Sequence, residues 1–171
     1  MPRTYSPLPQ SPIVDTNILF DHLVWRFHTE TRTALHLSLL QYLAAMPLDV
    51  LRRYLDAAMP IQTSFHVVAE LYGLTKKKPD WSGPTRESFW RFAREELLGI
   101  ELREHGVPIE EMNPEDLALL GPTDASILVL AVKLEASVLT IDGSLRGRCV
   151  RRGIEVLNYD TVVDLLKQGL I

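Results

Sequence analysis

The sequence contains one cysteine and no long apolar run. Cys149 has no partner for an internal disulfide, and a single thiol cannot form a thiolate metal site. The longest apolar run of note covers residues 127–132, far short of the roughly 18 to 20 residues that a membrane-spanning helix needs. These absences exclude a disulfide scaffold and a membrane-spanning chain, and they favour the reducing cytoplasm as the compartment.

The N-terminal residues lack the apolar core of a secretory signal and are instead rich in proline. Residues 1–12 hold four of the eleven prolines, which favours an extended conformation. We therefore predict a solvated arm over residues 1–11 and one domain over residues 12–171. With 46% hydrophobic and 23% charged residues, the chain resembles ordinary soluble domains that bury their own core.

An excess of basic residues is also absent. The chain has 22 acidic and 18 basic side chains, for a formal net charge of −4. This balance argues against a protein that holds nucleic acid by bulk electrostatic attraction. If four carboxylates are gathered around a cation, however, the remaining acids equal the basic residues in number. A local basic rim is then compatible with the composition.

Short β-branched segments alternate with longer stretches of helical periodicity along the chain. This alternation predicts an α/β fold with three layers, in which a mostly parallel sheet is flanked by helices, and an extra helical pair between Asp15 and Glu70. Strands are predicted at 11–15, 61–63, 107–109, 137–141 and 154–157. Helices are predicted at 18–27, 31–46, 48–58, 85–104, 114–120, 144–151 and 160–168, with one capped by Ser64 that buries Phe65, Val68, Leu71 and Tyr72, and one capped by Thr123 that runs to Leu134.

Four acids fall where such a fold gathers its ligands, at the carboxyl ends of parallel strands. Asp15 ends the first predicted strand and Asp142 ends the clearest one. Asp124 lies in a first helical turn, and Glu70 lies on the polar face of the helix that follows the second strand. Four separate segments are therefore expected to bring a carboxylate to one edge of the sheet.

Clustered carboxylates raise one another's pKa unless a cation balances their charge. Oxygen ligands without cysteine or paired histidines suit Mg²⁺ or Mn²⁺ better than zinc. An ion of this kind can activate water and neutralise the leaving oxygen of a phosphodiester. The pattern predicts metal-assisted phosphodiester hydrolysis, with Asp15, Glu70, Asp124 and Asp142 as both metal ligands and catalytic residues.

At these segments the sequence resembles the PIN-domain nucleases. The resemblance spans nearly the whole chain after the arm, and the order and approximate spacing of the four acids match the family. It rests on residues 13–19, 63–71, 122–131 and 138–145, followed by 153–156.

The resemblance implies a PIN-like fold and Mg²⁺- or Mn²⁺-dependent cleavage of RNA by the four acids. It also implies supporting roles for Asn17 and Thr140, two small polar residues beside those acids. Many members of this family are the toxins of VapC-like toxin–antitoxin pairs, so an antitoxin protein and a second copy of the chain are expected partners.

The chain departs from the family pattern in two places. Family members often carry a further acid shortly after the last aspartate, whereas residues 143–146 here are Gly, Ser, Leu and Arg. The separation of Asp15 from Glu70 is also longer than in compact toxin members. The first departure leaves the number of metal ions open, and the second favours the nuclease assignment over the toxin assignment.

Three basic residues are candidate RNA contacts. Arg146 and Arg148 follow Asp142 closely, and Lys77 lies in the basic loop over residues 76–84. Trp81, in the same loop, is the aromatic side chain best placed by the sequence to stack on an unpaired base. Charge runs are more often plain solvated surface, so these contacts are hypotheses.

Two other functions compete with the nuclease. A PIN-like scaffold would bind RNA or a protein partner without cleaving, and metal binding without RNA turnover would identify it. A phosphatase of the haloacid dehalogenase type also begins with a strand that ends in aspartate. That chemistry needs a second aspartate two residues later, where this chain has Asn17, so the phosphatase is disfavoured.

Overall fold

The computed structural model describes residues 11–77 and 81–171. The predicted arm lies outside the described residues except for Ser11. The described strands are β1 (Ile13–Val14), β2 (Gln62–Ser64), β3 (Arg103–His105), β4 (Val138–Leu139) and β5 (Val156–Leu157). They form one sheet in the order β3-β2-β1-β4-β5, and every neighbouring pair is parallel. The predicted parallel sheet is confirmed.

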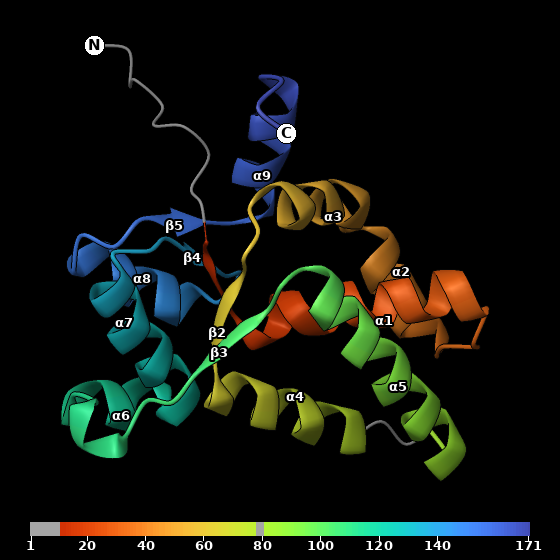
Figure 1. Ribbon diagram of the computed structural model, residues 1–171, viewed down its shortest axis with the longest axis horizontal. Helices are drawn as coiled ribbons and strands as arrows, with labels where there is room; N and C mark the ends of the chain where they lie inside the picture. The colour runs from red at the N-terminus through yellow and green to blue at the C-terminus, as the bar shows by residue number, and fades with distance from the viewer. Residues whose placement is uncertain (1–10, 78–80) are drawn as a thin grey trace.

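Helices connect the strands and flank the sheet, as the α/β prediction requires. Figure 1 shows α6, α7 and α8 gathered on the left of the sheet, with α1, α2 and α5 on the right. The helices in the described residues are α1 (Thr16–Thr31), α2 (Leu37–Ala44), α3 (Leu48–Ala57), α4 (Phe65–Lys76), α5 (Gly83–Gly99), α6 (Pro114–Leu120), α7 (Pro122–Leu134), α8 (Gly143–Arg151), α9 (Tyr159–Lys167) and the 3₁₀ helix η1 (Ile109–Glu111). None of these helices is both long enough and apolar enough to cross a bilayer.

The central strand β1 lies at the centre of the core. Ile13 and Val14 are completely buried, as are Ile18, Leu19 and Leu23 on α1. The buried apolar side chains of the described residues form one cluster that extends from the sheet to the surrounding helices. Because this cluster holds β1 and the start of α1, it fixes the direction in which the chain leaves the sheet at Asp15.

The helix predicted over 31–46 is too long at its N-terminus. α1 continues to Thr31 and ends where Arg32 adopts a left-handed conformation with φ 56°. The next helix, α2, begins only at Leu37, where the His36 side chain accepts a hydrogen bond from the backbone N–H of Ser38. Periodicity does not predict this break, because Leu35 is buried and falls at the same helical spacing as the apolar residues that follow it.

The region after α5 also differs from the prediction. The helix predicted over 85–104 is too long at its C-terminus, since α5 ends at Gly99 and Arg103 and Glu104 belong to β3. The strand predicted at 107–109 is wrong, since Ile109 begins the 3₁₀ helix η1. The sequence concealed β3 because an edge strand pairs on one side only and can consist entirely of polar residues, here Arg103–His105.

Two helix predictions need smaller corrections. Leu71 on α4 is buried as predicted, but Phe65 and Tyr72 are exposed and Val68 is only half-buried. Val67 and Thr75 complete the buried face with Leu71, one residue from every turn. The N-cap of α7 is Gly121, not Thr123. Pro122 takes the first helical position, where its missing N–H costs nothing, so the cap lies one residue before it.

A partly buried ion network ties α1, α3 and α5 together around Glu96. This carboxylate contacts His22 at 3.1 Å, Arg26 at 3.2 Å and Arg52 at 2.7 Å, and its side chain is only 9% exposed. Burial raises the pKa of Glu96, but hydrogen bonds from His22 and Arg26 outweigh it and hold that pKa at about 2. The network therefore favours the ionised carboxylate over its protonated form.

Replacing Glu96 by glutamine is expected to destabilise the protein by about 2 kcal/mol at neutral pH, since Arg26 and Arg52 lose the more buried of their two carboxylate partners. A carboxyl with a lowered folded-state pKa contributes stability above its unfolded value, which is lost as the pH falls. The difference between the two proteins should therefore shrink as the pH falls from 4.5 towards 2. Urea unfolding across this pH range measures it, and a pH-independent difference would contradict the assignment.

Candidate functional site

Two of the four predicted acids lie just after strands, and the other two lie in helices. Asp15 directly follows β1 and is the N-cap residue of α1. Asp142 follows β4 and caps α8, where its Oδ1 accepts a hydrogen bond from the backbone N–H of Leu145 at 2.8 Å. Asp124 lies in the first turn of α7, and Glu70 lies in the middle of α4.

Two threonine hydroxyls hold these acids in place. The Thr140 hydroxyl donates to Asp15 Oδ2 at 2.7 Å and accepts from the backbone N–H of Asp142 at 2.9 Å. The Thr16 hydroxyl donates to Glu70 Oε2 at 2.8 Å. These bonds connect the ends of β1 and β4 and join α1 to α4. The predicted supporting position of Thr140 beside Asp15 is therefore present in the structure.

The four carboxylates act on one another electrostatically. Burial raises the pKa of Asp15, which is only 2% exposed, and the charges of Asp142 and Glu70 raise it further. The pKa of Asp124 is raised to about 7, first by burial and then by the charges of the other three acids. Four segments that are distant in sequence therefore form one acidic cluster, which we call the acid quartet.

The side chains of the acid quartet do not converge on one point. Within residues 11–77 and 81–171, no three acidic, histidine or cysteine side chains converge closely enough to hold a metal. Charge repulsion acts over several ångströms, whereas Mg²⁺–oxygen bonds span only about 2.1 Å, so the two findings are compatible. The carboxylates are neighbours and would have to approach one another to share an ion.

The chemistry of the quartet fits a hard divalent cation. Its donors are carboxylate oxygens, the ligands that Mg²⁺ and Mn²⁺ prefer. In the part of the chain that the structure describes, the Asp124 carboxylate accepts no hydrogen bond from another side chain, so both of its oxygens remain open. A cation would also relieve the repulsion that raises the pKa of Asp124.

The other predicted site residues differ in how they are held. Asn17 is exposed in the first turn of α1, and no hydrogen bond joins it to the quartet among the described residues. Lys77 is exposed at the C-terminus of α4. Arg146 is exposed in α8, and its backbone N–H donates to the carbonyl of Asp142 at 3.0 Å. Of the three, Arg146 is tied most directly to the quartet.

Arg148 has a structural partner that the sequence did not indicate. Its guanidinium pairs with Asp116 and with Glu115, and its side chain is 13% exposed. Arg152 pairs with the same buried Asp116. Because these pairs occupy the Arg148 guanidinium, it is a weaker candidate for RNA contact than Arg146.

Trp81 is also buried, so its prediction as a base-stacking residue is wrong. The side chain is 4% exposed, and its ring lies 4.8 Å from Phe89 and 6.1 Å from Phe27, measured between centroids. A tryptophan in a polar loop looks exposed in the sequence, but here it closes the aromatic cluster between α1 and α5.

Sequence reasoning missed Thr16 and Asp116. Thr16 directly follows Asp15, and a hydroxyl at that position was a usable signal for contact with a neighbouring acid. The pairing of Asp116 with Arg148 and Arg152 joins α6 to α8 across more than thirty residues. Nothing local to Asp116 predicts this, since an acid in a first helical turn is ordinarily an exposed group.

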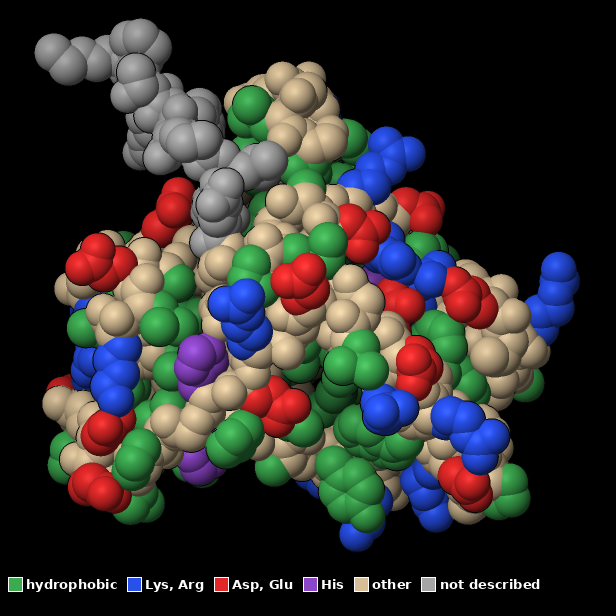
Figure 2. Space-filling view, viewed as in Figure 1, with side chains coloured by type: hydrophobic (Ala, Val, Ile, Leu, Met, Phe, Trp, Pro, Cys, Tyr) green, Lys and Arg blue, Asp and Glu red, His purple; other side chains and the backbone are tan. Residues whose placement is uncertain are grey.

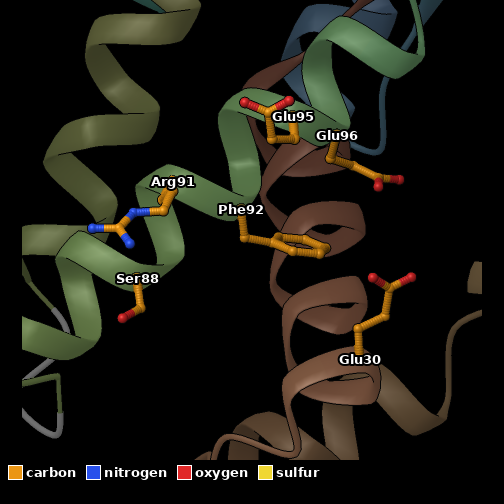
Figure 3. A pocket seen from close by; sticks show the side chains of 6 residues that line it. All are labelled: Glu30, Ser88, Arg91, Phe92, Glu95 and Glu96. Carbon is orange, nitrogen blue, oxygen red and sulfur yellow. The ribbon is translucent and has the colours of Figure 1, made fainter.

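A hollow of about 410 Å³ lies between α1 and α5 (Figure 3), and none of the four acids lines it. Phe92 of α5 extends towards α1 across it, and Glu30 and Glu96 border it. Arg26 pairs with both of these glutamates. This hollow is therefore bordered by the structural ion network and has no unexplained reactive group.

The charges over the face drawn in Figure 2 are mixed, with basic and acidic side chains interspersed rather than gathered in a basic patch.

Comparison with known proteins adds no functional information. No protein-family model matches the chain, and no curated protein is found as a relative. The acid quartet and its surroundings therefore carry the functional argument.

Proposed function

We propose that this protein is a metal-dependent ribonuclease of the PIN type. The observation that carries the proposal is the acid quartet. The four acids named by the resemblance come from four separate segments, and each contributes to one coupled electrostatic cluster. The all-parallel sheet and flanking helices agree with the three-layer fold that the resemblance implies.

Asp15, Glu70, Asp124 and Asp142 would hold Mg²⁺ or Mn²⁺. When bound, such an ion supplies a nucleophilic water and charge neutralisation at the phosphodiester. The Thr140 hydroxyl orients Asp15 and fixes the backbone at Asp142, and Thr16 orients Glu70. These contacts restrict the carboxylates before a substrate arrives, which lowers the cost of arranging them.

The test is cleavage of structured and single-stranded RNAs by the purified protein with Mn²⁺ or Mg²⁺, compared with Asp124→Asn prepared identically. We expect metal-dependent cutting by the wild type and a loss on the order of a hundredfold or more in the variant. The variant controls for contaminating nuclease, since both preparations would carry it. Equal cutting by both proteins would refute the assignment.

A second candidate function is a PIN-like scaffold that binds RNA or a protein without cleaving it. The observation that favours it is the open spacing of the quartet, in which no three ligating side chains of the described residues converge. Cation binding with no turnover of any RNA in the same panel would support the scaffold.

A toxin role for the ribonuclease would require an antitoxin, which co-purification with the product of an adjacent gene would reveal.

A further inference from the structure

A second hollow, of about 270 Å³, lies next to the acid quartet, and none of the four acids lines it. It opens where the corner between α2 and α3 approaches the ends of β4 and β5. Residues of the corner, of the β4–α8 connection and of the start of α9 line it, among them Ala45, Met46, Ile141, Arg146, Asn158 and Tyr159.

We infer that this hollow, the corner pocket, binds one unpaired nucleotide of the RNA beside the phosphate that the quartet cleaves. The inference rests on the proposed ribonuclease function and names a recognition element for it. Its first support is position. Ile141, which lines the pocket, is bonded directly to Asp142, and Arg146 lies one helical turn beyond that acid. A chain bound at the quartet therefore passes close to the pocket.

The lining suits a base with an attached phosphate. Met46 and Ile141 offer apolar surface to the face of a ring, and the Asn158 amide can bond to its edge. Asn158 Oδ1 already accepts from the backbone N–H of Thr161, so its NH₂ group is the part left for a ligand. The volume lies below the roughly 300–1,000 Å³ of drug-sized sites, which suits one nucleotide rather than a duplex.

Arg146 supplies the positive charge. Its side chain forms no ion pair among the described residues, whereas Arg148 and Arg152 of the same helix region are both paired with Asp116. Asp160 also lines the pocket and disfavours a ligand that is purely anionic. One cation, one carboxylate and one amide together fit the mixed donors and acceptors of a nucleotide.

The walls of the pocket are held by a partly buried hydrogen-bonded bridge. Tyr42 of α2 and Tyr159 of α9 both donate to Asp21 Oδ2, at 2.8 and 3.1 Å. This bridge fastens both walls to α1, the helix that begins at Asp15. The added segment between Asp15 and Glu70 thus builds part of the site, in a position fixed relative to the acids.

The experiment fills the pocket and leaves the acids intact. Ala45 lines the pocket and Ala44 does not, and both are exposed at the end of α2. Ala45→Trp is therefore matched by Ala44→Trp, and Arg146→Gln removes the charge alone. For each protein we would measure binding of a short fluorescein-labelled single-stranded RNA of mixed sequence by anisotropy, the same RNA as a duplex, and the cleavage fragments.

We expect Ala45→Trp to weaken single-strand binding roughly tenfold and to change the distribution of cleavage positions. Arg146→Gln should weaken binding and reduce its salt dependence, and Ala44→Trp should behave like the wild type. If the wild type cuts and all variants give the same fragments and affinity, the corner pocket is refuted and the ribonuclease stands. If no protein cuts but only the pocket variants lose binding, the ribonuclease fails, and the pocket stands as a nucleotide-binding site without its role in cleavage. No RNA binding by the wild type would overturn the inference.

Discussion

Replacing Asp15 by asparagine is expected to lower metal-dependent RNA cleavage by a factor on the order of 10³ or more, because the quartet loses its most buried carboxylate. The change should leave the fold intact. Asparagine has the shape of aspartate and can still accept the hydrogen bond that Thr140 donates. It also removes a charge that burial and neighbouring acids disfavour. In EDTA the variant should therefore be at least as stable as the wild type.

Thermal unfolding with and without Mn²⁺ separates the two effects. The wild type should be stabilised by the ion, since a ligand that binds only the folded state raises its stability by mass action. Asp15→Asn should show little of this gain. Asp164→Asn, an exposed acid on α9, is the matched control and should retain both cleavage and the response to metal. A variant that folds normally and still cuts at the wild-type rate would remove Asp15 from the mechanism.

Replacing Asp116 by asparagine is expected to cost about 3 kcal/mol of unfolding free energy. Asp116 is 1% exposed and balances Arg148 and Arg152, so its neutral replacement leaves two cations without their shared counter-charge. The loss should also loosen α8, whose first turn is capped by Asp142.

Urea unfolding at neutral pH measures this cost, and Asp160→Asn, at an exposed position in the first turn of α9, serves as the control. A loss below about 0.5 kcal/mol for Asp116→Asn would show that the pair contributes no more than a surface ion pair.

Sequence patterns locate a strand and the acid that follows it where the strand is buried and therefore apolar. β1 and β4 are apolar and contain β-branched residues, so their ends, and with them Asp15 and Asp142, could be located from the sequence. β3 could not, since a strand at the edge of the sheet needs no apolar side chains. The burial of Trp81 and the pairing of Asp116 with Arg148 depend on contacts between distant segments, which no local pattern encodes.

The spacing of the quartet was likewise beyond the sequence. The order of the acids predicts that they meet at one edge of the sheet, and their mutual effect on pKa agrees with this. How closely they approach depends on side-chain rotamers and on the balance of their charges. The corner pocket also depends on tertiary packing, because α2, β4 and α9 are separated by long stretches of chain.

The short, charged edge strand β3 bears on how copies of this chain would associate. A sheet edge with unpaired backbone groups invites another strand to add to it, which leads to uncontrolled aggregation. Here that edge is three residues long, and its side chains are Arg103, Glu104 and His105. Such an edge resists growth of the sheet from one molecule into the next. We therefore expect that any homodimer of this protein does not extend the sheet through β3.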